Sequence, residues 1–326
     1  MSPPSMRSYR SDDHFPVTRS TSAKLTFAFC TYNRAERLQG LVNHMRRQSC
    51  PIPFEMLAVD NNSTDHTVAE LSRLASEAGP LLRWVTEEKQ GIVPARNRAI
   101  QESINSDILV FIDDDETPKP GLLDAVTRAI LEDGAQCVGG RIEIDFEHFS
   151  RPRWLDDELL GFLGALDHGT GSFWITDKSR PIWSGNIAYA MSLFRNDPEL
   201  RFDERYNREG HGVGGGEDAM MLRCLIDRKI RIQYCPNMAV LHSVDPWKLK
   251  RRYFIKLHFR AGERLGQYQL PTYQRTIFGI PPFLILQMLR QAVKALALFI
   301  TASNGALRQT MNVANTFGLI LGYTRR

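Results

Sequence analysis

The sequence predicts an α/β protein with a doubly wound, mixed sheet and a C-terminal helical appendage. Short apolar runs alternate with segments of helical spacing from residue 24 to residue 144. Polar side chains recur where these predicted strands end, which is where ligands bind in open α/β sheets. Residues 245–326 lack such strands and carry apolar residues at helical spacing. These observations predict one sheet-based domain followed by helices.

The individual elements follow from the spacing of the apolar residues. Strands are predicted at 24–30, 55–60, 82–86, 109–112 and 137–144, and helices at 35–48, 66–77, 95–103 and 120–132. Residues 147–178 predict an irregular insertion with several aromatic side chains, and a small-residue turn within 182–190 enters a further strand. A helix is expected at 219–227, with short strands at 230–234 and 238–241.

Charge and cysteine usage limit the classes of protein to consider. The chain of 326 residues has a formal net charge of +4, with basic residues crowded at 248–264 and at the last two positions. Five scattered cysteines without a CxxC pair argue against a disulfide framework or a zinc site and fit a reducing compartment. We expect a flexible tail at 1–23 without the apolar core of a signal peptide, a sheet domain at 24–244 and a helical region at 245–326.

Four acids in a row end the apolar strand 109–112. Asp113, Asp114, Asp115 and Glu116 place negative charges side by side, which is costly unless a cation lies among them. Hard divalent cations such as Mg²⁺ or Mn²⁺ take carboxylate ligands and keep places for water and phosphate. The alternative is a solvated acidic turn before the next helix, because acids favour helix N-termini.

A glycine-rich loop at 211–218 precedes the helix 219–227 and ends in Glu217 and Asp218. Three glycines before two acids suit a mobile loop that folds over a ligand and brings a carboxylate to act as general base. The alternative is that Asp218 only caps the helix, which Asp does well.

Five short motifs follow one another between about Leu25 and His242. They are Thr31-Tyr32-Asn33-Arg34, Val59-Asp60-Asn61-Asn62-Ser63-Thr64-Asp65, the segment Gly91 to Asn97, Asp113-Asp114-Asp115, and Glu217-Asp218 followed by His242. In this order they cover about two-thirds of the chain and resemble the family 2 glycosyltransferases, which have the Rossmann-like GT-A fold. The acidic run and the C-terminal layout look most like bacterial enzymes that build exopolysaccharides or lipid-linked glycans.

The resemblance implies a site for a UDP-, GDP- or dTDP-sugar. Asp60 would accept a hydrogen bond from the base, and Arg96 would lie near the nucleotide or its phosphates. Asp113, Asp115 and His242 would reach a divalent cation, Mg²⁺ or Mn²⁺, although His242 is alternatively a structural residue. Asp114 fills the middle of the DxD motif, so which carboxylates touch the ion stays open. The implied donor-side residues are Thr31, Tyr32, Asn33, Arg34, Asp60, Arg96, Asp113 and Asp114, with Ser184, Gly185 and Asn186 on a sugar-side or acceptor-side loop.

The same resemblance implies a single displacement with inversion at the anomeric carbon. Asp218 would remove the proton from the acceptor hydroxyl, while Glu217 would orient the acceptor or the loop. The metal would stabilise the departing nucleoside diphosphate as a Lewis acid. We expect the acceptor to be a saccharide or a lipid-linked saccharide.

Three helices are expected after residue 244. Residues 245–269 predict a basic amphipathic helix, and 283–300 are strongly apolar but carry Gln287, Arg290, Gln291 and Lys294 at three- and four-residue spacing. Such a stripe argues against a spanning helix and suits one that lies in a membrane surface, and 307–321 repeat the design. The alternative is a helical hairpin packed on the sheet domain or on a second copy of the chain.

The sequence therefore predicts an inverting, metal-dependent glycosyltransferase, peripheral on the cytoplasmic face of a membrane. A polyprenyl-phosphate sugar transferase is the rival within enzymes, and true membrane spans would favour it. A binding or scaffold protein that has lost catalysis is the rival from another class, although the intact acids weigh against it. A nucleic-acid partner is not expected, because the basic helix lacks the aromatic interleaving of a stacking platform.

Overall fold

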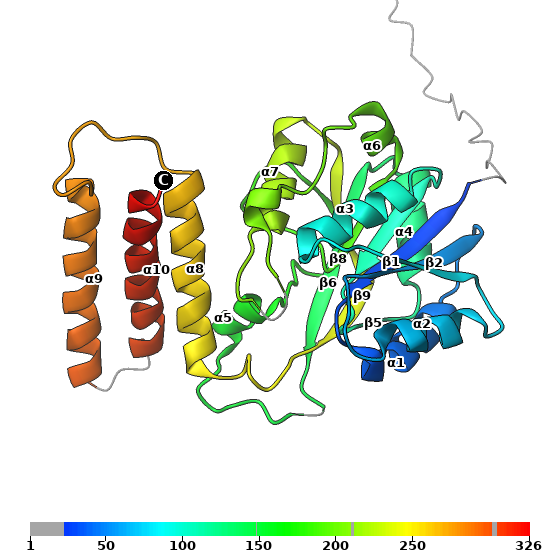
Figure 1. Cartoon of the computed structure of the whole chain (residues 1–326), viewed down its shortest axis with the longest axis horizontal. Helices are drawn as coiled ribbons and strands as arrows, with labels where there is room; N and C mark the ends of the chain where they lie inside the picture. Colours follow the sequence, from blue (N-terminus) through cyan, green and yellow to red (C-terminus); the bar gives the residue numbers. More distant parts are fainter. Residues whose placement is uncertain (1–22, 148, 210–211, 302–304) are drawn as a thin grey trace, which may run out of the picture.

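The computed structural model describes residues 23–147, 149–209, 212–301 and 305–326. The predicted tail at 1–23 therefore lies outside the described residues except for Ala23, and the glycine-rich loop is described from Gly212 onward. Within the described residues, a nine-stranded mixed sheet runs in the order β3-β2-β1-β4-β8-β6-β9-β5, and β7 pairs with β9 (Figure 1). The doubly wound mixed sheet predicted from the sequence is present.

The first half of the sheet is parallel. Its strands are β1 (Leu25–Thr31), β2 (Phe54–Asp60), β3 (Leu82–Thr86) and β4 (Ile108–Ile112), and its helices are α1 (Ala35–Arg46), α2 (Thr67–Ala75), α3 (Ile92–Glu102) and α4 (Leu122–Leu131). All residues of β4 are buried, as expected for a central parallel strand. Thr31 lies opposite Asp60 in the register, so the polar ends of β1 and β2 meet at one edge.

The second half of the sheet is largely antiparallel. Its strands are β5 (Glu116–Pro118), β6 (Cys137–Asp145), β7 (Phe173–Ile175), β8 (Asn186–Ala190) and β9 (Ile232–Ser243). Short helices accompany them: α5 (Asp157–Leu160), α6 (Ser192–Asn196), the 3₁₀ turns Gly161–Leu163 and Glu204–Tyr206, and the longer α7 (Glu217–Asp227). The antiparallel strand β8 separates β4 from β6, so the chain reverses next to the acidic run.

Several predicted boundaries are wrong. The two short strands expected at 230–234 and 238–241 form the single strand β9, because a register shift between Gly140 and Arg141 of β6 absorbs the irregular residues between them. Helix α3 begins at Ile92, before Pro94, since a proline in the first helical turn costs no hydrogen bond. The acids Glu217 and Asp218 are inside α7 rather than before it, and Gly216 in a left-handed conformation precedes the helix. The insertion at 147–178 contains the short strand β7.

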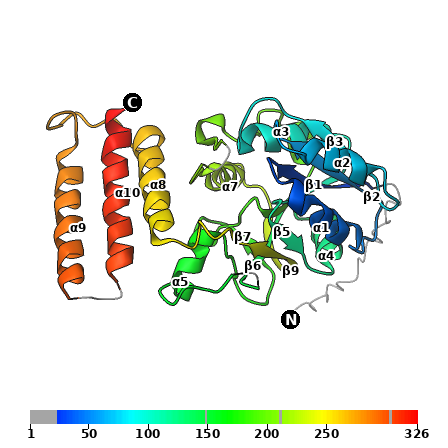
Figure 2. The ribbon, with the colours of Figure 1, turned by 60° about the horizontal axis from the view of Figure 1, so that its bottom comes forward.

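The C-terminal helices are α8 (Arg251–Tyr268), α9 (Pro282–Ile300) and α10 (Ala306–Thr324), which we call the helical unit. They lie side by side with α10 in the middle, and α9 is farthest from the sheet (Figures 1 and 2). The basic helix begins at Arg251 rather than at Asp245, since residues 245–250 form turns that cross from β9 to α8.

Glycines let α8 and α10 approach until their backbones touch. A Cβ atom on Gly262 would lie 2.0 Å from the carbonyl oxygen of Asn315, and one on Gly318 would lie 2.0 Å from that of Phe259. Gly266 and Gly322 repeat the pattern one turn further on. The spacing of four residues between the glycines of each helix is the small-xxx-small pattern of closely packed helix pairs.

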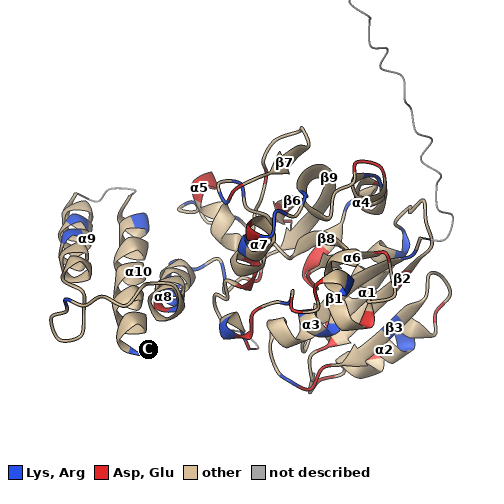
Figure 3. Ribbon diagram, turned by 90° about the horizontal axis from the view of Figure 1, so that it is seen from above, with Lys and Arg blue, Asp and Glu red and all other residues tan. Residues whose placement is uncertain are grey.

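The two parts of the chain carry opposite net charge. Residues 245–326 contain 13 Lys and Arg against two Asp and Glu, a net charge of +11, whereas residues 1–244 contain 28 against 35, a net charge of −7. In the ribbon of Figure 3, red Asp and Glu positions lie on loops around the sheet, whereas the coloured positions on α9 and α10 are blue Lys and Arg.

Candidate active site

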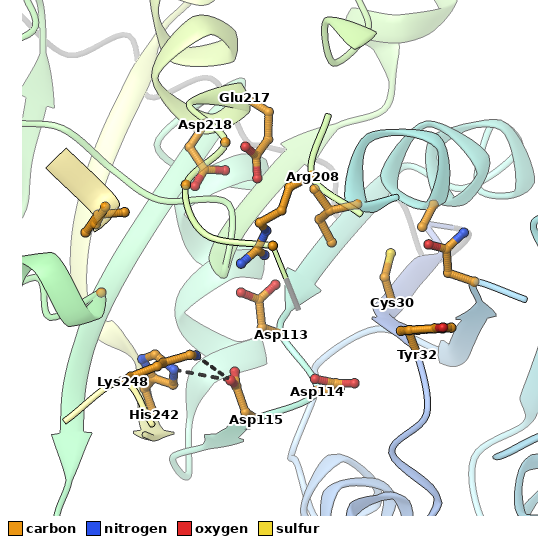
Figure 4. Close-up of a pocket in the computed structure, with 18 of the residues that line it drawn as sticks. Cys30, Tyr32, Asp113, Asp114, Asp115, Arg208, Glu217, Asp218, His242 and Lys248 are labelled. Atoms are coloured by element: carbon orange, nitrogen blue, oxygen red, sulfur yellow. Dashed lines mark hydrogen bonds and ion pairs between the residues drawn. The ribbon is translucent and has the colours of Figure 1, made fainter. Parts of the chain in front are cut away.

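A pocket of about 310 Å³ lies at the carboxyl edge of the parallel strands, in the size range of small-molecule sites. The sheet domain and α8 both contribute to its wall, since Tyr253 and Leu257 of α8 line it together with the acidic run (Figure 4). The polar lining comes from segments far apart in the sequence: Thr31, Tyr32 and Arg34 after β1, Asn61 after β2, Asp113, Asp114 and Asp115 after β4, Arg208, Glu217 and Asp218, and His242 and Lys248. Tertiary structure therefore brings most of the predicted site residues into one cavity.

Arg96 on α3 connects the two acidic groups of the site. Its guanidinium donates to Asp113 Oδ1 at 2.9 Å from one nitrogen. The other nitrogen donates to Asp218 Oδ1 at 3.0 Å and to Glu217 Oε1 at 3.2 Å. Burial disfavours the charged guanidinium, but the three carboxylates outweigh it and raise the pKa of Arg96. With a side chain only 3% exposed, Arg96 acts here as a buried crosslink between β4 and α7.

The four consecutive acids point in different directions, so their environments differ. Asp114 accepts a hydrogen bond from Thr31 Oγ1 at 2.8 Å, while burial and the charge of Asp115 raise the pKa of Asp114 to about 7. Glu116 begins β5 and is buried, and its Oε2 accepts a hydrogen bond from the Asp113 backbone N–H at 3.0 Å. Burial and the neighbouring Asp113 hold the pKa of Glu116 well above its usual range. The run is therefore not a solvated acidic turn.

Asp115 faces His242 and Lys248 across the pocket. His242 Nε2 lies 3.4 Å from Asp115 Oδ2, and Lys248 Nζ lies 3.3 Å from the same oxygen (Figure 4). Burial alone would raise the pKa of Asp115, but His242 and Lys248 outweigh it and hold that pKa well below its usual range.

Two of the three predicted metal ligands therefore lie together, and the third does not. Asp113 lies toward Arg96, and within the described residues no group of three His, Cys, Asp or Glu side chains is arranged to hold a metal. The buried Nδ1 of His242 lacks a hydrogen-bond partner in the described structure, so the imidazole is not fixed by a second bond. A carboxylate oxygen beside an imidazole nitrogen suits Mn²⁺ or Mg²⁺, which take one or two protein ligands when phosphates and water complete the shell. Asp115 and His242 fit such an ion.

The predicted nucleotide side of the site divides into lining residues and supporting residues. Thr31, Tyr32 and Arg34 line the pocket. Asn33 instead supports the next loop, because its Oδ1 accepts a hydrogen bond from the Thr64 backbone N–H at 2.7 Å. Asp60 is buried at the end of β2 and lies next to this lining, where Asn61 reaches the pocket.

The loop Ser184-Gly185-Asn186 lies behind the acids rather than in the pocket lining. A Cβ atom on Gly185 would lie 2.8 Å from Glu116 Oε1 and 3.1 Å from Asp113 Oδ2, so a larger residue here would displace these two carboxylates. Asn186 is fully buried, and its side chain donates to the backbone carbonyls of Arg141 and Met238 at 2.9 and 2.8 Å. The loop therefore packs against the acidic run on the side away from the pocket lining.

Sequence reasoning missed the residues that close the pocket from the C-terminal side. Arg208, Lys248 and Tyr253 line the cavity, and Lys248 was predicted only as part of a basic helix. Asp245 fixes the connecting turn, because it accepts hydrogen bonds from Arg34 Nη2 at 3.0 Å and from Arg37. The one signal that could have found Lys248 is its position six residues after His242, near the end of β9.

A mixed α/β sheet with a pocket and acids at its carboxyl edge is the arrangement in which many α/β enzymes bind nucleotides. Residues 26–197 match the model of Glycosyl transferase family 2, and the chain belongs to that family. It transfers a sugar from a nucleotide-sugar donor.

Relatives and solved structures support the same assignment. The chain is 37% identical over 241 residues to glycosyltransferase AglE of Haloferax volcanii, covering 73% of this chain and 71% of the relative. It is 24% identical over 240 residues to the succinoglycan biosynthesis protein ExoM of Rhizobium meliloti, covering 73% and 72%. The structure resembles the mannosyltransferase PcManGT of Pyrobaculum calidifontis, bound to GDP-Man and Mn²⁺, with a TM-score of 0.53, 16% identity and coverage of 92% and 73%. The predicted GT-A fold is confirmed.

Proposed function

We propose that this chain is an inverting, metal-dependent glycosyltransferase in which Asp218 is the general base. The observation that carries the proposal is the Arg96 crosslink, which holds Asp218 at a fixed position relative to Asp113. Asp218 lines the pocket, and only its Oδ1 is bonded to Arg96, so Oδ2 is left to accept a proton from an acceptor hydroxyl. A single displacement from that side inverts the anomeric carbon.

Glu217 has a positioning role in this proposal. It is 5% exposed, and burial together with Asp218 raises its pKa. A buried carboxylate bonded to Arg96 is poorly placed to meet an acceptor, but it does fix the guanidinium that orients Asp218.

Asp115 and His242 would hold the divalent cation, and Asp113 and Asp114 would contribute on the donor side with Thr31, Tyr32 and Arg34. When bound, the cation supplies Lewis-acid stabilisation of the diphosphate that leaves. The donor is a UDP-, GDP- or dTDP-sugar, and the acceptor is a saccharide or lipid-linked saccharide of a polysaccharide pathway. PcManGT binding GDP-Man and Mn²⁺, and the succinoglycan role in the name of ExoM, support this assignment.

The test is a thermal-shift screen of UDP, GDP and dTDP with Mn²⁺ and with EDTA, followed by donor hydrolysis with the best ligand. A ligand that binds the native state raises its melting temperature, so one nucleotide should stabilise the protein more with Mn²⁺ than with the chelator. Equal shifts in Mn²⁺ and EDTA would remove the metal from the proposal. No shift with any nucleotide would favour a non-catalytic scaffold protein.

We also propose that the helical unit places the enzyme on the cytoplasmic face of the cell membrane. Helix α9 exposes a row of large apolar side chains, each 45–77% exposed: Phe283, Leu286, Leu289, Val293, Leu296, Phe299 and Ile300. Its polar residues divide between two faces, which the sequence alone did not predict. Gln291 and Gln287 meet Gln309 and Thr316 of α10, whereas the two cations of the predicted stripe stay exposed.

This arrangement places polar groups between helices and apolar groups outside. A lipid environment favours this arrangement, because the polar side chains bond to one another between the helices and the apolar side chains face the lipid chains. The net charge of +11 on residues 245–326 adds attraction to anionic lipids. Within the described residues, α9 is also long and apolar enough to cross a membrane, and little of it is buried. Length and composition alone would allow the rival, a polyprenyl-phosphate sugar transferase with true spans.

Vesicle co-sedimentation tests the location. The protein should bind phosphatidylglycerol vesicles more than phosphatidylcholine vesicles, and Leu289→Gln with Leu296→Gln should lose that binding. Leu131→Gln, at an exposed leucine of the sheet domain, is the matched control. A dimer that persists without lipid and ignores vesicles would show that a second copy covers α9, and resistance to carbonate extraction would favour a true span.

A further inference from the structure

The cations around the pocket differ in how they are neutralised. Arg96 is bonded to three carboxylates, Arg34 to Asp245, and Lys248 to Asp115. Arg208 is the exception: among the described residues no carboxylate lies within 4.0 Å of its guanidinium and its side chain makes no hydrogen bond. The guanidinium nevertheless points into the pocket toward the acids (Figure 4).

The backbone around Arg208 is held by hydrogen bonds, so its side chain starts from a fixed point beside the pocket. The Arg208 carbonyl accepts a hydrogen bond from the Ile92 N–H at 3.0 Å, at the start of α3. The preceding Asn207 accepts one from the Val93 N–H at 3.2 Å through its side chain, and one from Arg264 Nη2 at 2.8 Å through its carbonyl. The Arg208 guanidinium is half-buried and feels the charge of Glu217, but no carboxylate is bonded to it, so a ligand that brings an anion would supply the missing bonds.

Two further donors line the pocket with Arg208. Lys248 comes from the turn after β9 with a side chain only 15% exposed, and Tyr253 comes from the first turn of α8. Arg208, Lys248 and Tyr253 all line the same pocket. Burial raises the pKa of Tyr253, and both cations oppose that rise, so the three groups act on one region.

The guanidinium of Arg208, the ammonium of Lys248 and the hydroxyl of Tyr253 are together suited to bind a phosphate group. Phosphate oxygens accept charge-assisted hydrogen bonds from arginine and lysine and a neutral one from a hydroxyl. Phe162, Leu257 and Trp247 also line the pocket, so its wall includes apolar surface as well as the donors.

We propose that Arg208, Lys248 and Tyr253 form a phosphate-binding subsite on the wall that the helical unit gives to the pocket. The subsite rests on the proposed function and adds to it a second means, besides the metal, of holding phosphate. The phosphate belongs either to the diphosphate of the donor or to a phosphorylated lipid acceptor, and the two sources are separable by experiment.

The test compares Arg208→Gln and Lys248→Gln with Arg205→Gln, an exposed arginine three residues before Arg208 that pairs with Asp203. Calorimetry measures UDP, GDP and dTDP against the corresponding nucleosides, and farnesyl phosphate against farnesol, each in Mn²⁺ and in EDTA. A charge-assisted hydrogen bond is worth enough to change affinity roughly tenfold. Melting temperatures confirm that the variants are folded.

If the phosphate belongs to the donor, both variants lose about tenfold in nucleoside diphosphate affinity and keep nucleoside binding. If it belongs to the acceptor, they keep nucleotide binding and lose about tenfold in farnesyl phosphate affinity, with farnesol unchanged. Lys248 contacts Asp115, a proposed metal ligand, so a loss in Lys248→Gln can also act through the metal. The loss in Arg208→Gln must therefore persist in EDTA, where no metal is bound. Tyr253→Phe should give a smaller loss of the same selectivity.

The subsite is wrong if both variants bind every phosphorylated probe like the wild type and like Arg205→Gln, or if the wild type binds none of the probes. Its failure is distinct from failure of the proposed function. Metal-dependent nucleotide binding that both variants retain overturns only the subsite, whereas farnesyl phosphate binding by a protein that ignores all nucleotides overturns only the proposed function.

Discussion

The pocket and the helical unit place polar side chains in opposite ways. In the pocket, charges are buried and bonded to one another, as where Arg96 meets three carboxylates. In the helical unit, α9 directs Gln287 and Gln291 at α10 and exposes both phenylalanines and most of its leucines. The first arrangement fixes reactive groups in a cavity, and the second leaves an apolar surface uncovered. One chain therefore contains two parts whose stability depends on different surroundings.

The largest effect should come from the proposed base. Asp218→Asn removes the proton acceptor but keeps the size of the side chain, so transfer should fall about 10²- to 10⁴-fold. Donor binding should stay near wild type, because the substitution leaves Thr31 and Arg34 in place. Product formation and nucleotide affinity are the two measurements.

Asp227→Asn at the other end of α7 is the control for this change. Asp227 is exposed and lies 3.8 Å from Arg223, so its loss should leave turnover unchanged. Unchanged turnover in Asp218→Asn would instead remove Asp218 from the mechanism.

The buried crosslink should dominate the stability of the sheet domain. Arg96→Ala leaves three carboxylates without their cation, and removing one partner of a buried charge network costs about 3–5 kcal/mol of unfolding free energy. Urea denaturation measures the loss. Arg98→Ala, two residues along the same helix, removes a half-exposed pair with Glu102 and should cost about 1 kcal/mol or less. Equal losses of unfolding free energy in the two variants would mean that burying the Arg96 network adds nothing to stability.

The same substitution should have opposite signs in the two parts of the molecule. Gly318→Ala adds a methyl group against the Phe259 carbonyl and should destabilise the helical unit by about 1–3 kcal/mol. Gly40→Ala adds a methyl group to open space on α1 and should stabilise the sheet domain by about 1 kcal/mol through helix propensity. Hydrogen exchange would assign each change to its part. A Gly318→Ala protein with unchanged protection of α8 and α10 would contradict the close packing.

The stability of the folded protein should depend on pH through the buried carboxyl group of Asp114. The folded pKa of Asp114 is raised to about 7, so the unfolded state ionises first as pH rises. The contribution of Asp114 to stability is therefore present below about pH 4 and is lost between about pH 4 and pH 7. Relative to Asp114→Asn, the wild type should lose at most about 1.4 kcal/mol per pH unit across this range. Urea denaturation in EDTA checks this, and a stability difference independent of pH would contradict it.

The sequence predicted the strands of the parallel half of the sheet, but not how distant strands pair or what individual buried side chains contact. Apolar runs such as Leu82–Thr86 had the right limits, because strand formation there depends on local pattern. The merging of two short strands into β9 could not be predicted, since it depends on a register shift in the neighbouring strand β6. The role of Asn186 was also inaccessible, because the carbonyls it satisfies belong to residues 45 and 52 positions away.

By itself the sequence determined the order of the first four strands and their helices, the acids that follow β4 and the apolar character of α9, because each follows from residue type and spacing along the chain. Only the tertiary structure decided which acids contact which basic side chains: Arg96 joins Asp113 to Asp218, and Lys248 meets Asp115. It also decided that Arg208 and Lys248 line the same pocket. The reason is that these relations depend on distances between segments far apart in sequence, and such distances are set by packing of the whole sheet.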